Sequence, residues 1–115
     1  MSLSLKTRKS DNVVILDLSG RLTSGEPVLL LRETIRQFVK DGNQRFVLNL
    51  ADVTFIDSSG LGELVTTYAT VKNKNGAVNL LHLTTKAKDL LQMTKLLTVF
   101  DSHDDEARAV AALKS

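Results

Sequence analysis

Hydrophobic and polar residues alternate over the first part of this chain, and the pattern predicts two strands. Leu3, Leu5 and Thr7 alternate with polar residues, and the apolar run 13–18 follows a turn-prone segment at 10–12. Alternation with a period of two is typical of strands. Because a short polar turn separates the two runs, we expect them to form a hairpin.

Farther along the chain, apolar residues recur every three or four positions, which is the spacing of amphipathic helices. Short β-rich runs separate these stretches. The run 45–50 is apolar on both faces, which predicts a strand at the centre of a sheet. The pattern of the apolar run 96–100 does not decide which type of secondary structure it forms. The apolar stripes of the expected helices span 28–39, 61–71, 87–91 and 107–113, and a further strand is expected over 77–83.

This order of elements predicts an α/β fold in a single domain over residues 1–115. Strands alternate with helices from the second strand onward, and such connections place consecutive strands parallel. We therefore expect a mixed sheet of four to five strands with about four helices, the first strand antiparallel and the rest mainly parallel. A chain of 115 residues is long enough to bury one core without disulfides or metals.

Two helix starts are predicted from residues that commonly cap helices. Thr23 or Ser24 is expected to cap the first helix, since a glutamate and a proline follow shortly after. Ser102, with Asp105 three residues later, is expected to open the last helix as a variant of the capping box.

The composition excludes several classes of function. The chain has no cysteine, 15 Lys and Arg against 13 Asp and Glu, and 4% aromatic residues. A disulfide framework is therefore excluded, and a scattered net charge of +2 does not favour nucleic-acid binding. Neither a signal-peptide core nor a membrane-spanning run is found, so we expect a cytoplasmic protein. The acidic run 101–106 suits a helix start better than a metal site, and we expect no metal, cofactor or catalytic residue.

The segment VTFIDSSGLGEL, residues 53–64, places two adjacent serines where a strand meets a helix. In a parallel sheet the loops after the carboxyl ends of strands carry ligands and reactive groups. The free N–H groups of the following helix favour a hydroxyl, a carboxylate or a phosphate. Asp57 and the serines are also preferred cap residues, so helix capping explains them as well. We expect Gly60 and Gly62 to leave the surface bare enough for a partner's backbone or a nucleotide to approach.

Three chemical roles compete for this loop. A nucleophile elbow needs Gly-x-Ser-x-Gly, but Ile56 and Asp57 stand two residues before the serines. A dinucleotide-binding motif needs a third glycine, which Val65 replaces. The third role is that a serine is itself the substrate of a partner kinase. Chemistry alone leaves the choice between Ser58 and Ser59 open.

The segment FIDSSGLG, residues 55–62, resembles the signature of the STAS domain of bacterial anti-sigma factor antagonists. The resemblance covers nearly the whole chain and implies the STAS fold. It extends to LDLSGRL at 16–22, FVLNL at 46–50 with Asp52 and Val53, AVNLL at 77–81, and VFD at 99–101 ahead of Glu106 and Ala107.

The resemblance implies a regulatory binding module and not an enzyme. The unphosphorylated form would bind an anti-sigma factor that is also a serine kinase, and would thereby free a sigma factor. That kinase would phosphorylate the first serine, Ser58, and so switch binding off, and a serine/threonine phosphatase would restore it. The residues expected to contact the partner are Asp57, Ser58, Ser59, Gly60, Leu61, Gly62, Thr23 and Ser24.

The same resemblance leaves one alternative open, a scaffold subunit of a stress-sensing signalling assembly, because this domain also builds such complexes. An antagonist is expected to be a monomer or small oligomer when alone, without direct contact with nucleic acid or membrane. Thr23 stands where many members of the family carry an acid, which alters the surface next to the serine loop.

Overall fold

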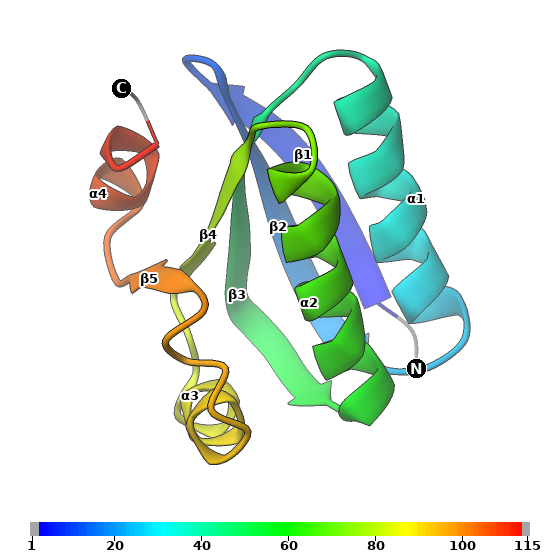
Figure 1. Ribbon diagram of the computed structural model, residues 1–115. Coiled ribbons are helices and arrows are strands. Elements are labelled where there is room, and N and C mark those ends of the chain that lie inside the picture. Colours follow the sequence, from blue (N-terminus) through cyan, green and yellow to red (C-terminus); the bar gives the residue numbers. More distant parts are fainter. Residues whose placement is uncertain (1–2, 114–115) are drawn as a thin grey trace.

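The computed structural model describes residues 3–113, which form one sheet flanked by helices (Figure 1). The order of strands and helices is the one that the hydrophobic pattern predicts. The elements are β1 (Leu3–Ser10), β2 (Val13–Leu22), α1 (Glu26–Lys40), β3 (Arg45–Ile56), α2 (Ser58–Lys72), β4 (Ala77–Leu81), α3 (Thr85–Met93), β5 (Asp101–His103) and α4 (Glu106–Ala111).

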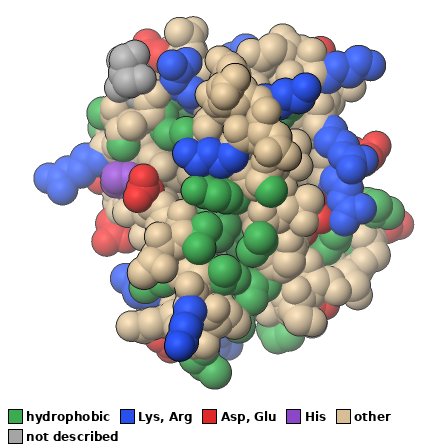
Figure 2. All heavy atoms as spheres, viewed as in Figure 1, with side chains coloured by type: hydrophobic (Ala, Val, Ile, Leu, Met, Phe, Trp, Pro, Cys, Tyr) green, Lys and Arg blue, Asp and Glu red, His purple; other side chains and the backbone are tan. Residues whose placement is uncertain are grey.

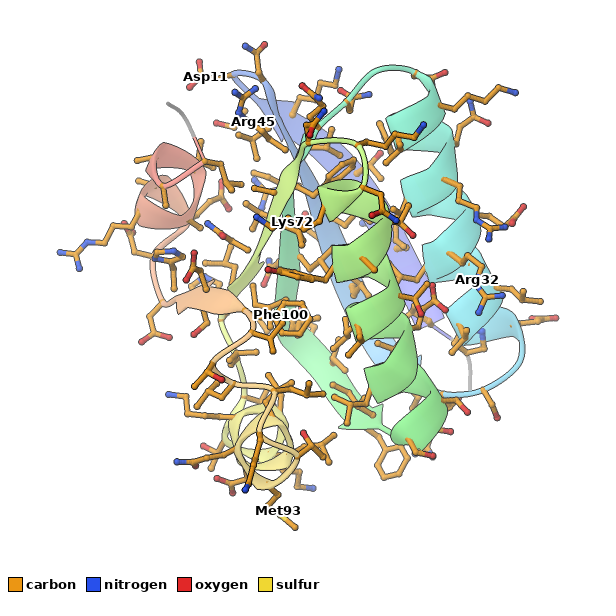
Figure 3. The ribbon with its side chains drawn as sticks, viewed as in Figure 1. Asp11, Arg32, Arg45, Lys72, Met93 and Phe100 are labelled. Atoms are coloured by element: carbon orange, nitrogen blue, oxygen red, sulfur yellow. The ribbon has the colours of Figure 1, made fainter. Side chains whose placement is uncertain are left out.

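The five strands lie side by side in chain order, with β3 at the centre. β1 pairs antiparallel with β2, and every later pair is parallel, so the predicted mixed sheet is confirmed. The run 96–100 contributes no strand, because β5 begins only at Asp101. Phe100 instead points toward α2, where its ring meets that of Tyr68 with 5.4 Å between centroids (Figure 3).

Helices α1 and α2 cover one face of the sheet, and α4 packs against the other (Figure 1). Phe46 and Leu48 of β3 belong to the larger core with residues of α1 and α2. Val47, which points the other way, packs with Val110 of α4 in a smaller core. This confirms that β3 is covered on both faces, as its sequence predicts.

The predicted caps of α1 and α4 are wrong. The N-cap of α1 is Gly25, whose φ of 92° suits glycine and whose position receives no side-chain cap bond. The backbone N–H of Ser24 donates instead to the carboxylate of Asp57 at 3.1 Å. The N-cap of α4 is Asp105, whose carboxylate accepts the N–H of Arg108 at 3.1 Å. Ser102 lies in β5, because strand pairing extends farther than the capping pattern suggests.

Helix α3 ends in a turn that holds Lys95 in a strained backbone conformation. The N–H of Leu96 donates to the carbonyl of Leu91 at 2.8 Å, and the N–H of Lys95 donates to Gln92 at 3.1 Å. These two bonds form a Schellman motif, which places Lys95 at the left-handed position with a φ of 62°. Glycine is the usual residue there because a Cβ atom costs roughly 1–2 kcal/mol in this conformation.

We expect Lys95→Gly to raise the free energy of unfolding. Relief of the left-handed strain, about 1–2 kcal/mol, exceeds the roughly 0.4–1 kcal/mol that glycine adds to unfolded-chain entropy. The net gain should be about 0.5–1 kcal/mol in urea denaturation. Lys95→Ala, which keeps the Cβ atom, is the control. A gain of the same size in the control would contradict the conformational explanation.

Helix α4 is tied to the hairpin by an ion-pair network around Arg8. Its Nε donates to Asp17 at 2.7 Å, and its Nη1 and Nη2 donate to the carboxylate of Glu106 at 2.8 and 2.7 Å. Arg8 holds the pKa of both carboxyls below their usual range, and a hydrogen bond from Asn49 adds to the effect on the pKa of Asp17. All three charged side chains are partly exposed, so screening by solvent reduces the contribution of this network.

This network should stabilise the fold above the ordinary carboxyl pKa values and lose its effect as the pH falls through the lowered ones. We therefore expect Arg8→Met to lower the free energy of unfolding at about pH 7 and to approach the wild type at about pH 3. Lys9→Met removes the same charge from the same strand and serves as the control. Equal curves for the two variants in urea denaturation at both pH values would contradict a specific role for Arg8.

Candidate functional site

The serine loop lies at the carboxyl end of the central strand β3. Helix α2 begins at Ser58, the first of the two serines, and both Ser58 and Ser59 are exposed. The hydroxyl groups therefore lie at a helix N-terminus within reach of another protein, as the sequence predicts. Helix N-termini favour negative charge through their free N–H groups and the helix dipole.

Asp57 is the residue that caps this helix. Its Oδ1 accepts the N–H of Gly60 at 2.8 Å, and its Oδ2 accepts the N–H of Ser24 at 3.1 Å. These backbone hydrogen bonds, that from Gly60 above all, lower the pKa of Asp57 and keep its side chain ionised. Chemistry alone had left three capping candidates open, and the structure selects Asp57. The serines are therefore not needed to cap the helix.

The same carboxylate joins two loops that the sheet brings together. Leu22 of β2 pairs with Ile56 of β3, so the loops that follow these parallel strands are neighbours. The N–H of Asp57 also donates to the carbonyl of Leu22 at 3.3 Å. Ser24 is consequently held beside the serine loop, exposed, and Thr23 is half-buried next to it. The structure thus brings the two loops that hold the expected partner contacts together at the carboxyl ends of β2 and β3.

The two glycines of the loop have different roles. A Cβ atom at position 60 would overlap the carbonyl oxygen of Leu22, so Gly60 permits close packing inside the domain. The expectation that it leaves surface bare is wrong, because it is buried. Gly62 is exposed with open space around it, as expected. Leu61 points into the larger core, so its contribution to the site is to anchor the helix.

Sequence reasoning missed a feature beside the serines, the outward turn of Phe55. The register of β2 against β3 shifts between Asp17 and Ser19 and again between Gly20 and Arg21. Bulges of this kind turn side chains away from the regular alternation. As a result Val53 is buried in the core while Phe55, two residues later, is 45% exposed. The one sequence signal for it is an aromatic residue two positions before the polar loop that begins at Asp57.

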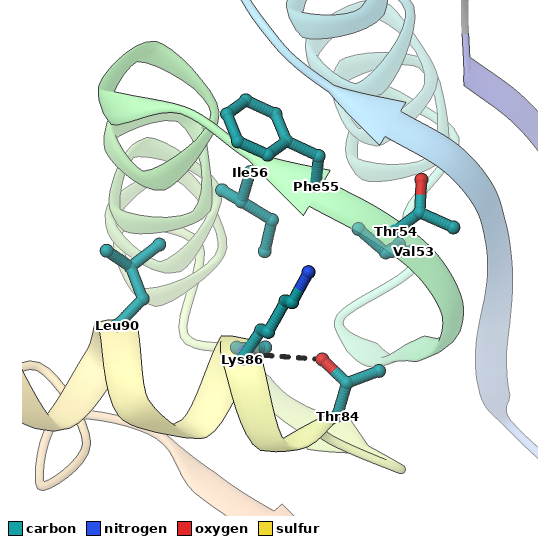
Figure 4. A pocket seen from close by; sticks show the side chains of 8 residues that line it. Val53, Thr54, Phe55, Ile56, Thr84, Lys86 and Leu90 are labelled. Atoms are coloured by element: carbon teal, nitrogen blue, oxygen red, sulfur yellow. Dashed lines mark hydrogen bonds between the residues drawn. The ribbon is translucent and has the colours of Figure 1, made fainter.

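A pocket of about 170 Å³ adjoins Phe55, between the end of β3 and helix α3 (Figure 4). The guanidinium carbon of Arg21 stacks over the ring of Phe55 at 4.5 Å from its centroid. Figure 2 shows hydrophobic side chains gathered in a patch between α2 and α3 on this face of the molecule. The pocket is lined by Val53, Thr54, Phe55, Ile56, Thr84, Lys86, Ala87 and Leu90.

Within residues 3–113, no cluster of three or more His, Cys, Asp or Glu side chains is placed to hold a metal ion. None of the helices in this part of the chain is long and apolar enough to cross a membrane.

The family model of the STAS domain matches residues 4–109 of this sequence. The match spans nearly the whole chain and includes both loops of the site. The chain belongs to the STAS domain family. This family assignment confirms the resemblance seen in FIDSSGLG, and the mixed five-stranded sheet with four helices in the described residues is the STAS fold.

Two similar proteins carry names that describe their roles. The anti-sigma F factor antagonist of Paenibacillus polymyxa is 25% identical to this STAS domain over 114 residues, which cover 99% of this chain and 97% of that protein. The anti-sigma-B factor antagonist of Bacillus subtilis is 28% identical over 102 residues, which cover 88% of this chain and 91% of that protein.

Solved structures share the fold of this STAS domain. A candidate anti-sigma factor antagonist from Thermotoga maritima superposes with a TM-score of 0.89 at 25% identity, covering 96% of this chain and 95% of that one. The Bacillus cell fate determinant SpoIIAA, 19% identical, has a TM-score of 0.76 in its phosphorylated form and covers 96% of this chain and all of its own. Its unphosphorylated form gives 0.73, with 95% of this chain and 96% of its own covered.

The packing of Gly60 against Leu22 makes a testable difference between the two glycines. We expect Gly60→Ala to lower the free energy of unfolding by about 1–3 kcal/mol, because a backbone oxygen cannot move aside easily. Gly62→Ala should raise it by up to about 1 kcal/mol, since alanine favours a helix and has space. Urea denaturation of both variants checks this pair. Opposite signs are expected, and equal losses would contradict the assigned roles.

Proposed function

We propose that this STAS domain is an anti-sigma factor antagonist controlled by phosphorylation of Ser58. In this proposal the unphosphorylated domain binds an anti-sigma factor that is also a serine kinase, and a sigma factor is released in the cytoplasm. The kinase phosphorylates Ser58 and binding ends, until a serine/threonine phosphatase removes the phosphate. The names of the curated relatives support the antagonist role.

The observation that carries the proposal is the position of Ser58. It is exposed, it is the first residue of α2, and Asp57 performs the capping that would otherwise occupy a serine. A kinase can therefore reach the hydroxyl without opening the fold. Ser59 is exposed as well, and the choice of the first serine rests on the family resemblance.

The domain should tolerate the phosphate while it is alone. A phosphate adds about −1.5 to −2 charges at neutral pH. The dipole at the start of α2 stabilises such a charge by about 0.3–1 kcal/mol, and the ionised Asp57 opposes it in part. SpoIIAA, which is known in both states, has the same fold in each. This likeness supports a switch that does not refold the domain.

The same charge should act strongly once a partner covers the loop. An uncompensated charge in a buried interface costs on the order of 3–5 kcal/mol. That penalty corresponds to an increase of about 150- to 4,000-fold in the dissociation constant. We propose that Asp57, Ser59, Gly62, Thr23 and Ser24 border this interface, with Gly60 and Leu61 fixing the loop from beneath.

We expect Ser58→Asp to weaken binding to the cognate anti-sigma factor kinase by about tenfold or more, since aspartate carries less charge than phosphate. Isothermal titration calorimetry with the purified kinase measures the change. Thr66→Asp places the same charge at an exposed position farther along α2 and serves as the control. Equal weakening by both variants would show an effect of net charge alone.

Phosphorylation itself is tested by incubating the domain with ATP and each anti-sigma factor kinase of the source bacterium. Mass spectrometry of the tryptic peptide 46–72 should show one phosphate. Ser58→Ala should abolish it, whereas Ser59→Ala should retain it. Phosphate on the Ser58→Ala variant, or on neither wild type nor variants, would overturn the assignment of Ser58.

A further inference from the structure

The edge of β3 beside the pocket is not covered by another strand. β3 pairs with β2 as far as Ile56, but its pairing with β4 ends at Asn49. Within residues 3–113, the segment 52–56 therefore has a strand on one side only. An uncovered strand edge presents free N–H and C=O groups that an added strand can bind.

The pocket beside this edge has the size of a single side chain. Its volume of about 170 Å³ is below the roughly 300–1,000 Å³ of sites that enclose small molecules. Its walls are mainly apolar, from Val53, Ile56 and Leu90, with the half-exposed ring of Phe55 at the margin. One apolar side chain of an extended segment would fill it while the backbone of that segment pairs with β3.

A positive charge without a partner lies in the same pocket. Lys86 extends from α3 toward β3, and its amine ends among the apolar side chains of the pocket (Figure 4). Within residues 3–113, the amine of Lys86 makes no hydrogen bond or ion pair. Arg21 adds a second cation over Phe55. Lys86 is itself exposed, so a carboxylate next to the apolar anchor can reach its amine at the margin of the pocket and form a charge-assisted hydrogen bond there.

We propose that the groove between the 52–56 edge and α3 binds an extended acidic segment of the partner protein, with one apolar side chain in the pocket and a neighbouring carboxylate on Lys86. The identity of this partner as the anti-sigma factor rests on the proposed function. Ile56 leads directly into Asp57 and Ser58, so the groove adjoins the switch. A phosphate on Ser58 would then repel the acidic segment in addition to its cost inside the interface.

The test uses two capped synthetic peptides of about eight residues, the length of an ordinary strand. Both alternate threonine and valine around a central leucine, which is followed by glutamate in one and by lysine in the other. Each is titrated into the isotope-labelled full chain and followed by amide NMR. We expect the acidic peptide to shift the amides of 52–56 and 86–90, and to bind at least about tenfold more tightly than the basic one.

Charge reversal at the groove gives a matched comparison. Lys86→Glu should reverse the preference between the peptides, whereas Lys88→Glu, an exposed lysine of the same helix outside the pocket, should leave it unchanged. Dodecanoate, an apolar chain with a carboxylate but no peptide groups, is titrated in parallel. Tighter binding of dodecanoate than of the acidic peptide would overturn the proposal in favour of a fatty-acid site.

Amide shifts confined to other parts of the chain, or equal affinity for both peptides, would also contradict the proposal that the groove binds an acidic segment. The peptide experiment involves neither kinase nor phosphate, so its failure leaves the phosphorylation assay on Ser58 unaffected. Conversely, a failed phosphorylation assay leaves the peptide result in place and removes only the identity of the partner.

Discussion

The site depends on one carboxylate, that of Asp57, which binds two backbone N–H groups from different loops. One of them belongs to Gly60 in the first turn of α2, and the other belongs to Ser24 after β2. The first bond starts the helix and the second holds the neighbouring loop against it. Because Gly60 has no side chain, the helix can approach the carbonyl of Leu22 closely enough for both bonds to form. Ser58 is thereby exposed on a fixed support.

The irregular half of β3 gives this support a second surface. The bulges against β2 leave Val53 in the core and turn Phe55 outward. Since β4 pairs only with the first half of β3, the second half borders a pocket on the side of α3. A single segment of strand thus leads from the proposed groove into the proposed phosphorylation site, and a partner bound there would contact both.

Electrostatics connects the two surfaces. Asp57 is ionised and already satisfied by backbone donors, whereas Arg21 and Lys86 lie near apolar surface without an acidic partner in the described chain. The unphosphorylated site therefore suits a partner with acidic character beside the loop. A phosphate on Ser58 would add about −1.5 to −2 charges beside the loop, so repulsion of an acidic segment and loss of desolvated contacts would act in the same direction.

The sequence by itself determined the elements and their order, because the spacing of apolar residues depends only on the period of helix or strand. It also determined the place of the serine loop, through Asp57, Ser58 and the two glycines at the end of an apolar strand. Only the tertiary structure decided which residues cap α1, α2 and α4, since Asp57 and Asp105 were chosen by the N–H groups within reach and Gly25 by its left-handed backbone. It alone showed the buried role of Gly60 and the outward turn of Phe55, because both follow from the register between β2 and β3, which local pattern does not encode.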